Sequence, residues 1–347
     1  MSKREAFEIG GECVEPGSRR TIDIPISQLS IHVPVSMSAH VIHGLRPGKT
    51  AFVSAAIHGD EIIGVEIIRR LLKMPVVDRV RGTLILVPIV NAYGFMAHSR
   101  YLPDRRDLNR SFPGSKKGSL AAQLAETFMR EIAGPSDWGI DLHTAAVHRE
   151  NLPQVRIAPG RSDLCELARA FAPPVILPAK IRPGSMRDAA GQVGTDILLY
   201  EAGEALRFDE TSIRIGVAGV LRVLRATGML AASAVKSSKI QSVESESSSW
   251  MRAPEGGILR AYKQCGDKVE KGDVLGIVAN PFGERETDVV ARRTGLIIGR
   301  TRLPVVNRGD GLFHIATIGE AGSIATSLAH MDREWEANPD FDEDEVF

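Results

Sequence analysis

The sequence predicts an α/β protein, with a three-layer αβα catalytic domain built on a mixed, mostly parallel sheet and a small all-β C-terminal domain. Three observations support this fold class. Strand-like and helix-like segments alternate over the first two thirds of the 347 residues. A serine-rich segment then interrupts the pattern, and beyond it short β-rich runs are separated by glycine. Strands that alternate with helices indicate a sheet covered by helices on both faces.

Strands are predicted where short apolar runs occur, and helices where apolar residues recur three or four positions apart. The helix predicted over 61–72, for example, carries Ile62, Val65, Ile68 and Leu72 on one face. The predicted strands are 51–57, 83–90, 138–142 and 197–200. The predicted helices are 61–72, 119–132, 163–171 and 212–226.

Composition divides the chain into four parts. Residues 1–232 form the predicted catalytic domain, of which 1–45 is a β-rich lead-in. Eight of the seventeen residues in 233–249 are serine, which is typical of a flexible linker. Residues 250–320 carry turn signals every few positions, as in a small β-barrel or half-barrel. Residues 321–347 form an acidic tail.

Charge and hydropathy exclude several classes of protein. Lys and Arg number 43, as do Asp and Glu, so the neutral chain shows no electrostatic footprint for nucleic acid or a membrane surface. Its longest apolar runs fall far short of the ~20 residues of a membrane-spanning helix. The N-terminus has no apolar signal segment, and the three cysteines are far apart. We therefore expect a cytoplasmic protein with a small-molecule partner; homo-oligomerisation is compatible with the sequence.

A histidine and a glutamate follow the first predicted strand, three residues apart. His58 ends that strand and Glu61 opens the next predicted helix, so both side chains face one point above the sheet. Gly59 between them permits a tight turn. His143 ends another strand, at the edge where α/β sheets bind ligands. Two His and one Glu, with a fourth position left to water, are a common catalytic zinc set. The alternative is that both histidines are ordinary buried residues near strand ends.

Between these segments lies an arginine-rich loop. It carries Arg100, Arg105, Arg106 and Arg110, and its Pro and Gly residues indicate turns. Arginine binds planar carboxylates through two parallel hydrogen bonds. Beside a metal site the loop is a candidate clamp for a substrate carboxylate; on its own it would be a solvated basic loop.

Three motifs in this order resemble the succinylglutamate desuccinylase/aspartoacylase family, within the wider zinc carboxypeptidase-like group. They are His58-Gly-Asp-Glu61, then Asp107-Leu-Asn-Arg110 with Phe112-Pro-Gly114, then Asp141-Leu-His143. The resemblance extends over roughly residues 40–320. It implies one Zn²⁺ per chain, held by His58, Glu61 and His143.

The resemblance also implies roles for further residues. Asn109 and Arg110 would hold a substrate carboxylate, and Arg100 would stabilise the developing oxyanion. The family's general base is a glutamate on a late strand of the catalytic domain. Glu201 matches that position, and Glu204, three residues on, is its rival. A carboxylate there can take a proton from the attacking water and pass it to the leaving amine.

Other polar residues near His143 are candidates for weaker roles. Arg149, Asn151 and Gln154 follow it in a predicted polar loop, where they would contact the variable part of the substrate. Asp60 and Asp141 would accept hydrogen bonds from the ligand imidazoles, or would cap a helix or a turn.

The C-terminal β region resembles the biotinyl/lipoyl-like half-barrel that is appended in this family, through Gly266-Asp267 and Gly272-Asp273. The carrier form of that domain needs a lysine at a hairpin tip. The corresponding stretch here, 284–288, has none, so we expect a structural or substrate-gating domain without a swinging cofactor.

These observations predict a zinc-dependent hydrolase, a deacylase that cleaves the amide of an N-acyl amino acid or a related small carboxylate-bearing substrate. Ester cleavage would follow from the same attack by water. The alternatives are a zinc carboxypeptidase acting on short peptides and a non-catalytic zinc- or carboxylate-binding protein. Glu201 and Arg100 argue against the last, because a binding protein needs neither a base nor an oxyanion donor.

Overall fold

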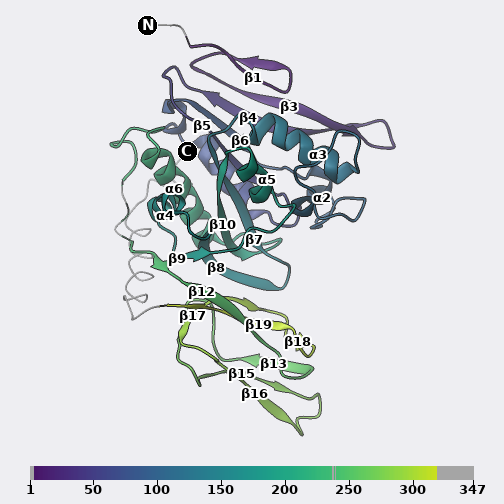
Figure 1. Cartoon of the computed structure of the whole chain (residues 1–347). Helices are drawn as coiled ribbons and strands as arrows, with labels where there is room; N and C mark the ends of the chain where they lie inside the picture. The colour runs from purple at the N-terminus through teal and green to yellow at the C-terminus, as the bar shows by residue number, and fades with distance from the viewer. Residues whose placement is uncertain (1–3, 237, 239, 319–347) are drawn as a thin grey trace, which may run out of the picture.

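One large sheet runs through most of the molecule (Figure 1). The structure is a computed structural model that describes residues 4–236, 238 and 240–318. Four parallel strands occupy the centre of the sheet, in the order β10, β7, β5 and β6. Their bounds are β5 (Thr50–Ala55), β6 (Thr83–Val87), β7 (Trp138–Ala145) and β10 (Asp196–Glu204). Strands β6 and β7 are buried along their whole length, as expected for strands covered on both faces.

Antiparallel strands extend this centre on both sides. The long hairpin of β3 (Ser18–Gln28) and β4 (Pro34–His43) continues the sheet beyond β6, and β8 (Arg149–Ile157) continues it beyond β10. The shorter strands are β1 (Phe7–Ile9), β2 (Glu12–Val14), β9 (Val175–Pro178) and β11 (Val243–Glu244). The hairpin agrees with the predicted β-rich lead-in.

Helices cover both faces of the sheet. Core residues of α1 (Ile63–Lys73), α4 (Ser162–Phe171) and α6 (Glu210–Ala226) pack in one cluster. Those of α3 (Leu120–Phe128) and α5 (Met186–Gln192) pack in a second cluster, on the face where α2 (Ala92–Met96) also appears in Figure 1. The short turns η1 (Val77–Arg79), η2 (Leu108–Arg110) and η3 (Met129–Ala133) complete this part. The three-layer αβα prediction is confirmed.

Local sequence explains the longer helices. In α1, Ile63, Ile67 and Leu71 form the fully buried stripe against the sheet, whereas Ile62, Val65 and Leu72 of the predicted face are only partly buried. In α6, the carboxylate of Asp209 accepts the Ser212 N–H at 2.7 Å and so caps the first turn. Among the described residues, no helix is both long and apolar enough to cross a membrane.

The C-terminal region consists of strands, as predicted. β12 (Ser247–Arg252), β19 (Gly311–Thr317), β17 (Gly295–Thr301) and β14 (Lys268–Val269) belong to the large sheet. β13 (Gly257–Ala261), β15 (Val274–Ala279), β16 (Glu286–Val290) and β18 (Val305–Val306) form a separate four-stranded sheet. Because β17 pairs with β8, the C-terminal strands continue the catalytic sheet directly.

The structure corrects two expectations about secondary structure. Part of the expected linker is ordered: β11 pairs with β9, and β12 pairs with β19, so residues 243–244 and 247–249 lie in the sheet. Ser245 Oγ donates there to Thr317 O at 2.8 Å, whereas the buried Ser249 Oγ has no partner among the described residues. The predicted polar loop after His143 is strand β8, whose polar side chains line a pocket. The predicted acidic tail lies outside the described residues.

Candidate metal centre and its pocket

The three predicted metal ligands lie at the carboxyl edge of the parallel strands. His58 follows β5 in a turn in which the Glu61 N–H donates to the His58 carbonyl at 3.1 Å. A Cβ on Gly59 would lie 1.9 Å from the Gly94 carbonyl carbon, so only glycine permits this approach of the two segments. Glu61 stands two residues before α1 rather than within it. His143 lies near the end of β7.

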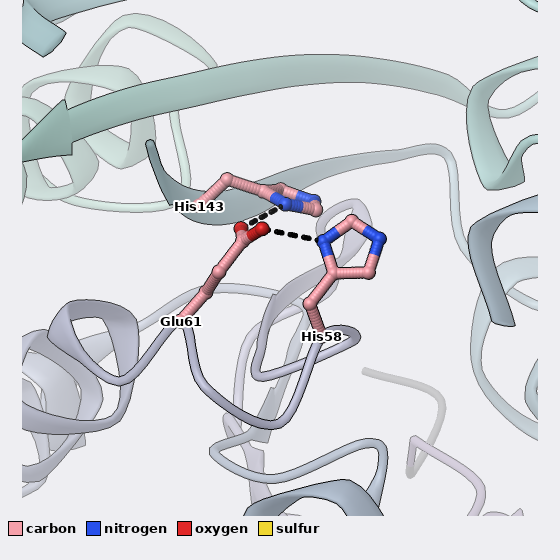
Figure 2. A group of neighbouring side chains, drawn as sticks. All are labelled: His58, Glu61 and His143. Atoms are coloured by element: carbon pink, nitrogen blue, oxygen red, sulfur yellow. Dashed lines mark hydrogen bonds and ion pairs between the residues drawn. The ribbon is translucent and has the colours of Figure 1, made fainter. Parts of the chain in front are cut away.

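The Glu61 carboxylate lies between the two imidazoles (Figure 2). His58 Nδ1 contacts one of its oxygens at 2.7 Å, and His143 Nδ1 contacts the other at 2.7 Å. All three side chains are buried, and one ligand atom from each lies within 4.8 Å of the others. The sequence-predicted cluster is therefore assembled by the fold.

A second carboxylate holds the far nitrogen of each imidazole. His58 Nε2 lies 3.1 Å from Asp107 Oδ1, and His143 Nε2 lies 2.7 Å from Asp141 Oδ2. Asp141 thus accepts a hydrogen bond from a ligand imidazole, as expected. Asp60 was expected to do the same, but its buried Oδ1 has no partner among the described residues, and Asp107 contacts the His58 imidazole instead. Such partners fix which imidazole nitrogen faces a metal.

Electrostatics within the cluster favour a bound cation. Burial opposes a charged imidazole, yet Asp141 and Glu61 outweigh it and raise the pKa of His143 well above its usual range. Burial likewise opposes the charge of Glu61, but His58 and His143 lower the pKa of that carboxyl. A divalent ion bound here would displace any proton from the ligand nitrogens, because metal ligands must be deprotonated.

The donor set fits zinc. Two imidazole nitrogens and one carboxylate oxygen converge, both rings are held by second carboxylates, and a pocket opens beside them. Three protein ligands with an open position are typical of catalytic zinc, whereas structural zinc sites are closed and commonly contain Cys. None of the three cysteines belongs to this cluster.

Arg100 connects the cluster to the arginine-rich loop. Its guanidinium donates to Glu61 Oε1 at 3.1 Å and to Asp107 Oδ2 at 2.9 Å. Burial favours the neutral guanidine, but Glu61 and Asp107 outweigh it and raise the pKa of Arg100. Arg100 therefore places a permanent positive charge beside the metal ligands.

Glu201 lies directly opposite His143 on the neighbouring parallel strand. Asn151 Nδ2 donates to one of its carboxylate oxygens at 2.8 Å, and Arg156 Nη1 lies 3.2 Å from the other. Glu204 lies elsewhere, where it accepts the His148 N–H at 3.0 Å, lines a different cavity and has a long ion pair with Arg302. Of the two rival carboxylates, only Glu201 faces the pocket of the metal ligands.

A cavity of about 490 Å³ contains most of the predicted site. It is lined by nine of the residues expected from the sequence: His58, Glu61, Arg100, Asn109, Arg110, His143, Arg149, Asn151 and Glu201. Arg105 and Arg106 are exposed and lie outside it. Gln154 is fully buried and donates to the carbonyls of Leu152 and Ile298, so it is a packing residue and not a substrate contact.

The lining residues that were not predicted include six with charged or aromatic side chains. They are Arg156 on β8, Lys180, Arg182, Arg187 on α5, and Trp250 and His314 from the C-terminal region. Arg187 Nη1 is buried and has no partner among the described residues, and burial, followed by the nearby Arg156, lowers the pKa of Arg187. The sequence carries no signal for these positions, because each belongs to a segment without a catalytic motif.

Basic side chains dominate the lining, with seven Lys or Arg against three Asp or Glu. Arg110 donates to the neighbouring Asn109 carbonyl and has no carboxylate partner in the part of the chain that is described. Asn109 Oδ1 accepts the Met186 N–H at 2.9 Å, which ties this loop to the start of α5. The pocket therefore carries uncompensated positive charge.

Comparisons with known proteins agree with this geometry. Residues 47–227 match the family model described as the succinylglutamate desuccinylase/aspartoacylase catalytic domain. N-alpha-acetyl-L-2,4-diaminobutyric acid deacetylase of Halomonas elongata is 27% identical over 286 residues, which cover 79% of this chain and 84% of that protein.

Solved structures show the same fold. A succinylglutamate desuccinylase from a Silicibacter species is 26% identical, with a TM-score of 0.77 over 87% of this chain and 95% of that one. The product-bound ectoine utilization protein EutE of Ruegeria pomeroyi has a TM-score of 0.78 at 24% identity, over 86% of this chain and 95% of that one. These relatives include deacylases, which supports a hydrolase.

Proposed function

The chain belongs to the succinylglutamate desuccinylase/aspartoacylase family, and from this premise we propose that it is a zinc-dependent deacylase. Its substrate would be a small N-acyl amino acid that bears carboxylate groups. The observation that carries the proposal is the convergence of His58, Glu61 and His143 in one cavity with Glu201. This arrangement supplies metal ligands and a separate carboxylate, which amide hydrolysis by water requires.

His58 Nδ1, His143 Nδ1 and a Glu61 oxygen would hold one zinc ion. When bound, the ion supplies Lewis acidity, which lowers the pKa of water and polarises a carbonyl. Asp107 and Asp141 would keep the two imidazoles oriented through their Nε2 atoms.

Glu201 would act as the general base and then as the general acid. Its carboxylate takes a proton as the water oxygen bonds to the acyl carbon, and returns it to the nitrogen as the C–N bond breaks. Asn151 and Arg156 fix the orientation of this carboxylate. Arg100 would stabilise the negative charge that develops on the carbonyl oxygen, because its guanidinium already lies beside the metal ligand Glu61.

The basic lining favours an anionic substrate. Arg110, Arg182 and Arg187 have no carboxylate partner among the described residues. Burial first, and nearby positive charges after it, lower the pKa of both Arg110 and Arg187. A substrate carboxylate would relieve this repulsion and accept paired hydrogen bonds. A cavity of about 490 Å³ also suits a small molecule.

The test is hydrolysis of a substrate panel by the zinc-loaded protein, with products identified by mass spectrometry. The panel contains N-acetyl and N-succinyl derivatives of aspartate, glutamate and diaminobutyrate, the matching esters, and short peptides. We expect release of the free amino acid from an N-acyl amino acid. Preferred cleavage of peptides would favour the carboxypeptidase alternative, and tight binding without turnover of any compound would favour a binding protein.

A further inference from the structure

The C-terminal β region contributes an aromatic wall to the pocket. Trp250 on β12 and His314 on β19 are directly paired across the two strands. Their rings stack with centroids 4.8 Å apart and planes inclined by 7°, and both residues line the pocket of the metal ligands. In the large sheet β17 separates β19 from β8, and both β12 and β19 lie on the side away from β3 and β4 (Figure 1).

His314 is a buried imidazole with one nitrogen left unpaired. Its Nε2 lies 2.8 Å from Ser248 Oγ, while Nδ1 has no hydrogen-bond partner among the described residues. Burial, followed by the positive charge of Arg156, lowers the pKa of His314 to about 3, so the ring is neutral at physiological pH. A buried polar atom without a partner calls for an explanation, and a ligand group is one.

The neighbours of this wall are cationic. The Arg149 guanidinium carbon lies 5.1 Å from the centre of the Trp250 ring, as in a cation–π contact. Arg156 lies beside Glu201 and acts electrostatically on His314. Ligand groups with a positive charge would be repelled here. Arg156 already pairs with Glu201, but Arg149 has no carboxylate partner among the described residues, and a neutral amide would leave its charge uncompensated. An anionic group satisfies both Arg149 and a neutral N–H donor.

We propose that Trp250 and His314, together with Arg149 and Arg156, form a subsite for a second substrate carboxylate, on the side of the pocket that the C-terminal β region supplies. His314 donates its Nδ1–H to that carboxylate, while Ser248 donates its hydroxyl hydrogen to Nε2. The inference rests on the proposed function, because it identifies the substrate as a dicarboxylate. It also assigns substrate selection in part to the C-terminal β region.

Two substitutions of His314 distinguish the contributions of its two ring nitrogens. His314→Asn retains a polar group near the position of Nδ1, whereas His314→Gln retains one near Nε2. His40→Gln is the matched control, because His40 on β4 also has a buried Nε2 without a partner but lies outside the pocket. Circular dichroism establishes that each variant is folded.

Binding is measured by calorimetry on the zinc-loaded full chain, with succinate and glutarate and the monoamide of each. We expect the preference for the dicarboxylate over its monoamide to fall roughly tenfold to a hundredfold in His314→Gln, the usual range for a hydrogen bond to a charged group. His314→Asn should retain most of the preference, and His40→Gln all of it. The proposal would be overturned if His314→Gln kept the full preference for the dicarboxylate. It would also be overturned if this variant lost equal affinity for the dicarboxylate and its monoamide.

Turnover distinguishes this inference from the proposed function. If no N-acyl compound is hydrolysed but His314→Gln still loses the dicarboxylate preference, the deacylase proposal fails and the subsite stands. If N-acyl dicarboxylates are hydrolysed with unchanged acid-over-amide selectivity in His314→Gln, the subsite fails and the deacylase proposal stands.

Discussion

The two ends of the pocket handle charge in opposite ways. At the metal end, each of His58, Glu61 and His143 contacts a partner of opposite charge. At the arginine end, defined by Arg110, Arg182 and Arg187, no guanidinium has a carboxylate partner among the described residues. At the metal end the charged side chains pair with one another around the candidate cation site. At the arginine end the guanidinium charges are left to pair with a ligand.

This difference has a physical cost. Arg110 and Arg182 are exposed, but Arg187 Nη1 is buried and has no partner among the described residues. A buried charge without a partner destabilises the folded state, because no ion pair offsets its desolvation. Residues kept in that condition are expected at functional sites, where activity and stability oppose each other. Substitutions at the two ends should therefore have different consequences.

The largest effect is expected at the metal end. His143→Ala should lose most of the bound metal and nearly all activity, because it removes one of three protein ligands. Metal content after dialysis, determined by mass spectrometry, and hydrolysis of the best substrate measure the two losses. Glu61→Gln, which keeps the shape of the side chain, should behave similarly; full metal occupancy in both folded variants would contradict the ligand assignment.

The next largest effect concerns the base between the two ends. Glu201→Gln should retain zinc but reduce kcat by roughly 10²–10⁴-fold, the usual contribution of a general acid–base group. Glu204→Gln is the matched control, since Glu204 is three residues away and outside the pocket. Should Glu204→Gln be the more damaging variant, the base is misassigned.

A smaller effect is expected for the carboxylate clamp. Arg110→Lys should lower kcat/KM roughly tenfold to a hundredfold, because lysine cannot form the paired hydrogen bonds of a guanidinium. The loss should largely disappear for a substrate whose carboxylate is replaced by an amide. Arg105→Lys, in the same loop but exposed and outside the pocket, provides the control. An equal loss of kcat/KM for the acid and the amide substrate would mean that Arg110 shapes the site without binding the carboxylate.

The stability cost of the arginine end is tested by Arg187→Met. Removal of a guanidinium whose Nη1 is buried and unpaired should raise the free energy of unfolding by about 1 kcal/mol while lowering activity. Arg70→Met is the contrasting variant, because Arg70 pairs with both Glu66 and Glu210, and it should be destabilised. Urea denaturation of the metal-free proteins compares the two; a destabilised Arg187→Met would show that the charge is compensated after all.

The smallest effect is a pH-dependent one, outside the pocket. Hydrogen bonds from Arg70 lower the pKa of Glu210 from 4.5 to about 2, against burial and with help from Arg214. Its ion pairs therefore contribute stability above about pH 4.5, which is lost as the pH falls toward 2. Glu210→Gln should cost about 1 kcal/mol or less at pH 7, since the pair is half-exposed and screened.

That difference between the Glu210→Gln variant and the natural chain should shrink as the pH is lowered from 5 to 2. Urea unfolding at several pH values measures it. A difference that stays constant over this range would show that the Glu210 carboxylate does not contribute through its charge.

Periodicity and short motifs in the sequence determined most of the catalytic region. The apolar stripe of α1 and the continuous burial of β6 and β7 follow from residues close together in the chain, so the αβα architecture was predictable. The positions of His58, Glu61 and His143 at strand ends likewise placed them at one sheet edge, because carboxyl ends of parallel strands meet there. The resemblance of the motifs to a family supplied Glu201 and the arginine-loop residues.

Tertiary structure alone decided the rest of the pocket. Arg156 and Arg187 lie on a strand and a short helix that carry no catalytic motif, and Trp250 and His314 come from a region expected to be separate. The pairing of β17 with β8 brings that region against the metal site. Such pairing depends on hydrogen bonds between backbones about 150 residues apart, and local sequence carries no record of which distant strand will be the partner. The sequence thus predicted which three side chains gather at the metal end, and the fold decided which side chains face the other end.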